Sequence, residues 1–399
     1  MSGHVRRGDI IQVTIDTVAF GGDGIGRIDR RVVFVPFTAE GDIVDVEIVD
    51  IRKKYVRGII HTITQASPKR IVARCPYYYR CGGCQYQHIS YHHQLRMKER
   101  QVTESFERIG KIPSPPVKTI IFSSRPFNYR GKAEYHLIFR KDGYPEVGFM
   151  DVEGGTIVDV EQCEIVDESI NRVYRRFREA LMSGSETFQG DRFTVWSEFD
   201  DTELPQDRFE FSTIGRKVKD KIFFVPQEGF FQTNISLVDT LVDRVLAMAA
   251  ATRSDVVLDL YCGSGLFSVF VSPCVRKVYG IEMNHEAARC ARLNMDTYGV
   301  SNTEIVEGRV EDVLKSDFIG EKRIDAVILD PPRVGCGRGA LARIAELKPS
   351  RIIYVSCNPT TQARDVRYLL DEGFSLMELQ PIDMFPQTKH IEVIALLER

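Results

Sequence analysis

The chain has 399 residues, of which 43% are hydrophobic and 27% charged, and a formal net charge of −3. This composition is typical of a globular protein with two or three domains, and the net charge gives no general sign of nucleic-acid binding. No apolar run approaches the roughly 20 residues that span a bilayer, and the opening stretch MSGHVRRGDI lacks an apolar signal segment. We therefore expect a cytoplasmic protein that is not embedded in a membrane.

Residues 1–66 are predicted to form a small β-barrel. The stretches DIIQVTIDTVAF and IVDVEIVDI alternate apolar and polar residues, the period of a half-buried strand, and GGDGIGR and TAEGD are typical of turns. Short strands in this number favour a closed barrel of the OB type, which often binds oligonucleotides; a barrel used for assembly fits equally well. The run from Ile51 to Arg70 has six basic residues and no acid. Alone it indicates a solvated face, but beside an RNA-binding barrel it would attract phosphates.

Residues 67–228 contain a group of cysteines. The stretch CPYYYRCGGC places Cys75, Cys81 and Cys84 in one loop, and VEQCEIV adds Cys163. Disulfides are rare in cytosolic proteins, and four thiolates suit either a tetrahedral zinc ion or an iron–sulfur cluster. Between them, SYHHQLRMKERQVTESFERIG predicts a helix that ends at Gly110. Short strands and one helix at about 168–182 complete a β-rich region.

Residues 229–399 alternate helices with apolar strands, which predicts an α/β fold with a mostly parallel, doubly wound sheet. The stretch VVLDLYCGSGLF places Asp259 at a strand end and Gly263 and Gly265 before a helix, and Glu282 ends the next strand. An acid at this spacing typically holds ribose hydroxyls. Because a full G-x-G-x-x-G is absent, a dinucleotide is not expected. The pattern resembles the cofactor loop of class I S-adenosylmethionine-dependent methyltransferases.

Two further strand ends carry candidate catalytic groups. Asp330, in ILDPPR, should point into the same crevice, and Arg333 stands where amino-group methyltransferases have an aromatic residue, so N-methylation is not expected. Cys357 ends the strand IIYVSC, and Glu392 begins the strand in HIEVIALL. A thiolate that adds to C6 of uracil would activate C5 toward a methyl sulfonium, and a carboxylate could then take the C5 proton. Each residue also has a plainer interpretation, as a buried thiol and a solvated acid.

The order of the motifs FFQTN, DLYCGSG, DPPR, SCNP and HIE resembles the RNA uracil-5-methyltransferase family over nearly the whole chain. The resemblance implies that Cys357 is the nucleophile and Glu392 the base. It also places Phe230 and Gln232 beside the target base. The S-adenosylmethionine contacts that it implies, together with the two glycines of the loop, are Gln232, Tyr261, Gly263, Gly265, Glu282 and Asp330.

Further features resemble the members of this family that modify 23S rRNA. C-G-G-C-x-x-Q is similar to their [4Fe–4S] site, which implies the cluster ligands Cys75, Cys81, Cys84 and Cys163. The barrel resembles a TRAM domain, and PFNYRGKAEYHL resembles a substrate-contact segment that offers Arg130 and Lys132 to phosphates. The helix over residues 91–110 is expected to pack on the catalytic domain.

The target RNA and the reaction leave alternatives open. A uridine of 23S rRNA is the expected target, with no protein partner. A tRNA T-loop uridine, cytosine-5 methylation and a non-catalytic RNA-binding assembly factor are the alternatives. A radical enzyme is a further rival, but its C-x₃-C-x₂-C loop differs from the C-x₅-C-x₂-C spacing found here.

Overall fold

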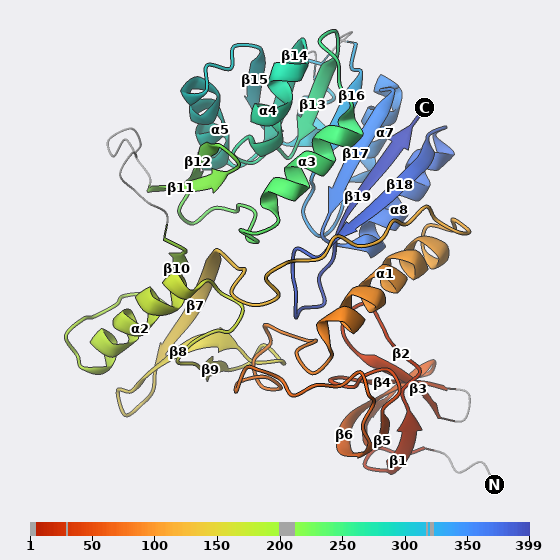
Figure 1. Ribbon diagram of the computed structural model, residues 1–399, viewed down its shortest axis with the longest axis vertical. Helices are drawn as coiled ribbons and strands as arrows, with labels where there is room; N and C mark the ends of the chain where they lie inside the picture. The colour runs from red at the N-terminus through yellow and green to blue at the C-terminus, as the bar shows by residue number, and fades with distance from the viewer. Residues whose placement is uncertain (1–4, 29–30, 199–211, 317, 320–322) are drawn as a thin grey trace. The chain divides into compact units, whose positions relative to one another are not determined.

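The computed structural model describes residues 5–28, 31–198, 212–316, 318–319 and 323–399 (Figure 1). The chain divides into two compact units, each built from separate pieces of sequence. Unit 1 comprises Met1–Gln101, Arg125–Trp196 and Phe385–His390, and unit 2 comprises Val102–Ser124, Ser197–Met384 and Ile391–Arg399. Among the described helices, none is both long and apolar enough to cross a bilayer.

Unit 1 begins with a six-stranded sheet in the order β1-β5-β6-β4-β3-β2. Its strands are β1 (Ile10–Thr14), β2 (Thr17–Val18), β3 (Gly24–Ile28), β4 (Arg31–Val35), β5 (Ile43–Ile51) and β6 (Tyr55–Gln65). Alternate residues of β5 are buried, Val44, Val46 and Ile48 among them, as the apolar period predicts. The predicted β-structure is therefore confirmed, and closure into a barrel stays a prediction.

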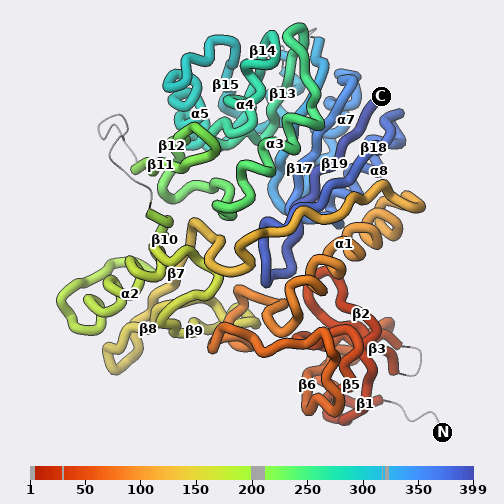
Figure 2. The backbone as a smooth tube through the Cα atoms, viewed as in Figure 1, coloured from red at the N-terminus to blue at the C-terminus, as the bar shows by residue number. Residues whose placement is uncertain are grey.

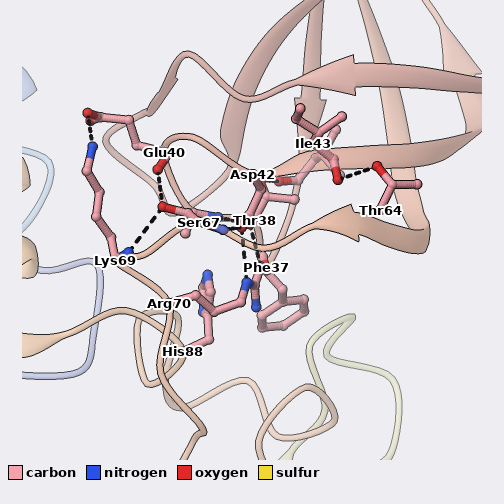
Figure 3. Close-up of polar contacts among 12 residues, drawn as sticks. Phe37, Thr38, Glu40, Asp42, Ile43, Thr64, Ser67, Lys69, Arg70 and His88 are labelled. Atoms are coloured by element: carbon pink, nitrogen blue, oxygen red, sulfur yellow. Dashed lines mark hydrogen bonds and ion pairs between the residues drawn. The ribbon is translucent and has the colours of Figure 1, made fainter.

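A buried ion pair joins this sheet to the segment that follows it (Figure 3). Asp42 is fully buried, and its carboxylate accepts hydrogen bonds from the backbone N–H of Ala39 (2.6 Å) and of Ser67 (2.8 Å) and from Arg70 Nη2 (2.6 Å). Lys69 Nζ lies 2.5 Å from Glu40 Oε1. Lys69 and Arg70 of the basic run 51–70 are thus held in ion pairs within unit 1, and the exposed Arg52 and Arg57 lie beside Asp50 and Asp23.

The rest of unit 1 is a second sheet with its helix. Strands β7 (Lys132–Phe139), β8 (Pro145–Met150), β9 (Ile157–Asp159) and β10 (Arg192–Trp196) pair in the order β10-β7-β8-β9. Helix α2 (Glu168–Met182) begins at the N-cap Asp167, and its Tyr174 stacks on Tyr135 with ring centroids 4.1 Å apart. The predicted helix at 168–182 is confirmed. Residues 199–211 of the predicted β-rich region lie outside the described part of the chain.

Helix α1 (Tyr91–Arg108) confirms the helix predicted before Gly110, and its residues are divided between the units at Gln101 and Val102. Gly110 lies just after the helix at a position that has no room for a side chain, because a Cβ there would meet the carbonyl oxygen of Phe106 at 2.7 Å. Whether this helix packs on the catalytic domain, as expected above, stays a prediction.

Unit 2 contains a seven-stranded sheet with helices packed along it (Figure 1). Its order is β15-β14-β13-β16-β17-β19-β18, and the pairs from β15 to β17 are parallel, as predicted. The strands are β13 (Val256–Leu260), β14 (Lys277–Glu282), β15 (Thr303–Glu307), β16 (Ala326–Leu329), β17 (Arg351–Ser356), β18 (Ser375–Ile382) and β19 (Glu392–Glu398). A hairpin, β11 (Thr213–Val218) and β12 (Lys221–Pro226), precedes it.

The helices of unit 2 follow the strands in alternation. They are α3 (Val238–Ala249), α4 (Leu266–Val271), the 3₁₀ turn η1 (Ser272–Cys274), α5 (His285–Thr297), α6 (Val310–Val313), α7 (Arg338–Leu347) and α8 (Pro359–Asp371). Strand β19 runs antiparallel to both of its neighbours, β17 and β18. This reversal brings the start of β19 to the edge of the sheet where the parallel strands end.

Replacement of Asp42 by Asn tests the buried ion pair. The loss of the carboxylate leaves Arg70 buried without its anion, so we expect the free energy of unfolding to fall by about 3–5 kcal/mol in denaturant titrations.

The effect of this variant should depend on pH. Burial opposes ionisation of Asp42, but the hydrogen bonds from Arg70, Ala39 and Ser67 outweigh burial and lower the pKa of Asp42 below the usual 3.8. The stabilisation is therefore complete above that pH and is lost as the pH falls through the lowered pKa, where wild type and variant should converge. Asp50→Asn, which removes an exposed partner of Arg52, should change little.

Candidate active site

The pairing of β17 with β19 sets Cys357 and Glu392 beside each other. Ser356, the last residue of β17, pairs with Val393 of β19. Because the two strands are antiparallel, Cys357, which follows Ser356, lies opposite Glu392, which precedes Val393. The chain then turns at once into α8, because the Asn358 side chain accepts a hydrogen bond from the Thr360 N–H (3.1 Å) and Pro359 fits the first helical turn. A strand that ends on Cys-Asn-Pro thus holds its thiol at the open edge of the sheet.

Arg333 is the cation of this site. Burial raises the pKa of the Cys357 thiol to about 11, and the nearby Glu392 raises it further, whereas Arg333 acts through its charge and a hydrogen bond to lower it. From the sequence, Arg333 was identified only as the residue that replaces an aromatic side chain. Its place three residues after Asp330, beyond a strand end, was the available signal.

Two buried carboxyl groups share the site with the thiol. Burial raises the pKa of Glu392 well above its ordinary 4.5, Asp330 adds to this rise, and Arg333 opposes it. Burial likewise raises the pKa of Asp330 to about 7, with a contribution from Asp259. Neighbouring carboxylates in a desolvated site cannot all ionise at low cost, which favours a shared proton.

The turn after β13 has an unusual backbone. Tyr261, Gly263 and Gly265 all have positive φ, at 62°, 54° and 80°. A Cβ at Gly263 would meet no atom within 4 Å, so its backbone faces open space, whereas one at Gly265 would lie 2.8 Å from the Met295 side chain. The first glycine therefore leaves the backbone accessible, and the second permits close packing of the helices.

Two buried polar atoms near this turn have no hydrogen-bond partner among the described residues. The Gly263 N–H donates to Glu282 Oε2 at 2.9 Å, which brings the predicted acid to the loop. Asp259 Oδ1 and Ser264 Oγ are buried and have no hydrogen-bond partner among the described residues. Buried polar atoms are normally satisfied, so these two fit a ligand with polar groups, such as the amino-acid part of S-adenosylmethionine.

A cavity of about 820 Å³ opens beside the turn. It is lined by Tyr261, by Gly308 and Glu311 beyond β15, and by Pro332 and Cys336 beyond β16. Its volume suits a nucleoside-sized ligand. Of the predicted cofactor contacts, Tyr261 lines this cavity, and the others are placed around the turn or at Asp330.

The two named residues of the F-x-Q motif differ in burial: Gln232 is buried and Phe230 is exposed. Gln232 is buried, and its Nε2 donates to Asp330 Oδ2 at 3.4 Å, so the structure brings these two predicted residues together. The Phe230 ring is 71% exposed. An aromatic face that is open to solvent can stack on a base.

The four predicted cluster cysteines line one cavity of about 120 Å³ in unit 1. Burial raises the pKa of Cys163 to about 12, with further increases from Cys81 and Cys75, so the thiols lie within electrostatic reach of each other. The sequence-remote Cys163 is fixed by its N–H bond to Asn171 Oδ1 (2.9 Å). No three His, Cys, Asp or Glu side chains in the described ranges converge on a single-ion position.

The two predicted phosphate contacts lie near this cavity. Arg130 lines it, and its Nε donates to the Lys132 carbonyl at 2.9 Å. Lys132 Nζ lies 4.8 Å from the centroid of the Trp196 ring. The arginine is therefore close to four potential thiolates, and the lysine takes part in a cation–π contact.

Comparison with known proteins agrees with this geometry. Residues 209–399 match the family model of tRNA (uracil-5-)-methyltransferase, and residues 4–60 match that of the TRAM domain. An uncharacterized RNA methyltransferase of Halalkalibacterium halodurans is 32% identical over 99% of this chain and 98% of its own, and one of Gloeobacter violaceus is 33% identical over 100% and 98%.

A solved structure matches almost the whole chain. The Pyrococcus abyssi tRNA (uracil-54, C5)-methyltransferase in complex with S-adenosyl-L-homocysteine has a TM-score of 0.73 and 25% identity, and the match covers 97% of this chain and 100% of that one. From the family models, the full-length relatives and this fold, the chain belongs to the RNA uracil-5-methyltransferase family and carries an N-terminal TRAM domain.

Proposed function

We propose that this enzyme methylates C5 of a specific uridine in 23S rRNA through a covalent bond between Cys357 Sγ and C6 of the base. The observation that carries the proposal is the position of Cys357 next to Glu392 across the β17–β19 pair, with Arg333 acting on the thiol. A nucleophile, a base and a cation are thus gathered at one sheet edge, in a chain of the uracil-5-methyltransferase family.

The residues act in sequence on the uracil ring. The Cys357 thiolate adds to C6, and the electrons of the C5–C6 double bond move toward O4, where the enolate forms. S-adenosylmethionine would supply the methyl group that C5 then attacks, and its methyl–sulfur bond would break to leave S-adenosylhomocysteine. Glu392 takes the C5 proton, the C–H electron pair re-forms the C5–C6 double bond, and the S–C6 bond breaks to restore the thiolate. No atom of the protein is oxidised or reduced.

The target base must leave its stack to reach Cys357. The exposed Phe230 ring offers it a surface to stack on, and Gln232 lies beside Asp330 at the same edge. We assign the S-adenosylmethionine contacts to Gln232, Tyr261, Gly263, Gly265, Glu282 and Asp330. The unpartnered Asp259 Oδ1 and Ser264 Oγ and the adjacent cavity support this assignment.

Unit 1 supplies the proposed RNA surface and a [4Fe–4S] cluster. Cys75, Cys81, Cys84 and Cys163 would hold the cluster in their shared cavity, where Arg130 would offset the negative charge of the thiolates. The cluster would tie the cysteine loop to the second sheet. We propose that residues 1–66, Arg130 and Lys132 bind RNA, that residues 67–228 carry the cluster, that residues 229–399 perform catalysis, and that the enzyme works in the cytoplasm.

A tRNA uridine is the second candidate target. The solved structure that matches this chain over 97% of its length is a tRNA (uracil-54, C5)-methyltransferase. The cysteine loop favours rRNA because its spacing resembles that of the rRNA enzymes, so the two substrates must be compared directly.

A trapping experiment with 5-fluorouridine tests both the mechanism and the target. Fluorine at C5 cannot leave as a proton, so the Cys357–C6 bond should persist. Wild-type protein, S-adenosylmethionine and competing fluorinated 23S rRNA fragments and tRNA should give an adduct on a denaturing gel, with the rRNA favoured. Cys357→Ala should abolish the adduct, and Cys274→Ala, at an exposed cysteine, should retain it. Trapping of tRNA alone would move the target to the second candidate, and no trapping would refute the mechanism.

The pH dependence of kcat/KM tests the role of Arg333. Both Cys357 and Glu392 must lose a proton to act, and both pKa values are raised, so the rate should climb as the pH rises above neutral. Arg333→Gln removes the group that lowers the thiol pKa, so the rising limb should move to higher pH, with a loss of about tenfold for each unit of displacement. Arg323→Gln, at a largely exposed arginine, should leave the profile in place. A loss that is equal at every pH would contradict this role.

Metal analysis tests the cluster. Protein purified without oxygen should contain about four iron and about four sulfide per chain and absorb in the visible range. Cys163→Ser should lose most of both, because it removes the ligand that joins the loop to the second sheet. Cys290→Ser, at a buried cysteine of α5, should keep them. Stoichiometric zinc without iron would disprove the assignment.

A further inference from the structure

The segment Phe385–His390 joins β18 to β19 and ends two residues before Glu392. It belongs to unit 1, although the residues on both sides of it belong to unit 2. Figure 2 shows it as a blue stretch beside the orange tube of the N-terminal third of the chain. The backbone that leads into the proposed base is therefore held by side chains and loops of unit 1.

Helix α1 holds this segment with two buried side chains one turn apart. Gln94 Oε1 accepts from the Gln387 N–H (3.1 Å), and Gln94 Nε2 donates to Gln387 Oε1 (2.9 Å). Lys98 Nζ donates to the Phe385 carbonyl at 3.0 Å. Both Gln94 and Lys98 are fully buried. Burial of an ammonium is costly unless its hydrogen bonds are made, so this contact is a strong constraint on the carbonyl.

The cysteine loop holds the same segment from a second direction. The N–H groups of Gln85 and Tyr86 both donate to the Gln387 carbonyl, at 3.0 and 2.9 Å, and Gln85 Oε1 accepts from the Lys389 N–H at 3.1 Å. Gln85 directly follows Cys84, and its Nε2 donates back to the Gly82 carbonyl at 2.8 Å. The loop that carries three of the four cluster cysteines is thus hydrogen-bonded to the segment that precedes the proposed base.

The conformation of Gln387 shows that these bonds determine the path of the chain. Gln387 has a φ of 68°, in the left-handed region that a residue with a side chain seldom adopts, and it is 2% exposed. Such a conformation persists where the surroundings over-determine it. Here both backbone polar groups and the side-chain oxygen of Gln387 are bonded, and the preceding Pro386 carbonyl accepts from the Tyr129 hydroxyl (3.0 Å).

We propose that the cysteine loop and helix α1 form a brace that positions Glu392 for proton abstraction, with Gln85, Gln94 and Lys98 as positioning residues. The inference rests on the proposed function and deepens it, because it gives the cysteine loop a part in one step of the reaction. The brace touches neither substrate nor the reacting atoms. It acts through Phe385, Gln387 and Lys389, the three bonded residues of the segment that leads to Glu392.

The brace should affect the last step of the reaction selectively. Thiolate addition and methyl transfer depend on Cys357, which lies on β17, whereas release of the product waits for Glu392. If Glu392 is held less firmly, methyl transfer should therefore be nearly unchanged and the loss of the C5 proton should be slower. The enzyme would then accumulate as a covalent complex with ordinary, non-fluorinated RNA.

Single-turnover reactions of the full-length, cluster-containing protein separate these steps. The RNA is the one trapped above, labelled with tritium at C5 of uridine, and the methyl group of S-adenosylmethionine carries ¹⁴C. Methyl incorporation reports transfer, tritium release reports proton abstraction, and a denaturing gel reports the adduct. Gln94→Leu should slow tritium release about tenfold or more while methyl incorporation changes less than about twofold, and the adduct should accumulate as it does in Glu392→Gln.

Gln101→Leu is the matched control. Gln101 is also buried and lies on the same helix, but its Nε2 donates to the Val18 carbonyl (3.0 Å) and to the Tyr86 hydroxyl (3.2 Å). It should show no separation of the two rates. If Gln94→Leu does not fold, Lys98→Met removes the bond to Phe385 and should give the same separation.

Hydrogen exchange provides a readout that is independent of activity. The amides of Gln387 and Lys389 should exchange faster in Gln94→Leu than in Gln101→Leu. Faster exchange without a separation of the rates, or equal slowing of both rates, would overturn the brace. Absence of a 5-fluorouridine adduct with the wild-type protein would instead refute the proposed function itself, so the two failures are distinguishable.

Discussion

The antiparallel pairing of β19 with β17 is the constraint on which the site depends. In a parallel sheet the carboxyl ends of the strands share one edge, and Asp330 and Cys357 lie there because they follow β16 and β17. A residue at the start of a parallel strand would lie at the opposite edge. Because β19 is reversed, its first residue, Glu392, reaches the edge where Cys357 stands.

This arrangement concentrates acids in a poorly solvated place. Asp330 raises the pKa of Glu392, Asp259 raises that of Asp330, and Glu392 raises that of the Cys357 thiol. Burial raises the pKa of all four groups. Arg333 is the group that opposes this effect at both Cys357 and Glu392. The net effect of burial and of the neighbouring acids is to favour the protonated forms of the Cys357 thiol and the Glu392 carboxyl. The chemistry therefore requires that protons be moved within the site as each new bond is formed.

Local patterns in the sequence predicted the strands and helices well, because their apolar periods and end signals are short-range. Helix α1 and helix α2 have the predicted ranges within a few residues. Strand β18 was not predicted individually: it contains Pro381 and lies at the sheet edge, where proline is tolerated. Its outer side is paired at single bridges with Val117 and Ile121, which no local pattern reveals.

The residues of the proposed site also fall into those that sequence motifs predict and those that only long-range contacts reveal. Cys357 and the acids at strand ends could be predicted from motifs, but the bonds between Gln94 and Gln387 span 293 positions and have no sequence signature.

The same contacts determine when unit 1 can be completed during synthesis. Unit 1 contains the first 101 residues, yet its last piece is residues 385–390. During synthesis, helix α1 is complete long before the backbone that its Gln94 and Lys98 will bind has been made. In an unfinished chain the bonds of these two side chains to the segment are missing, and unit 1 is complete only once residues 385–390 have been made.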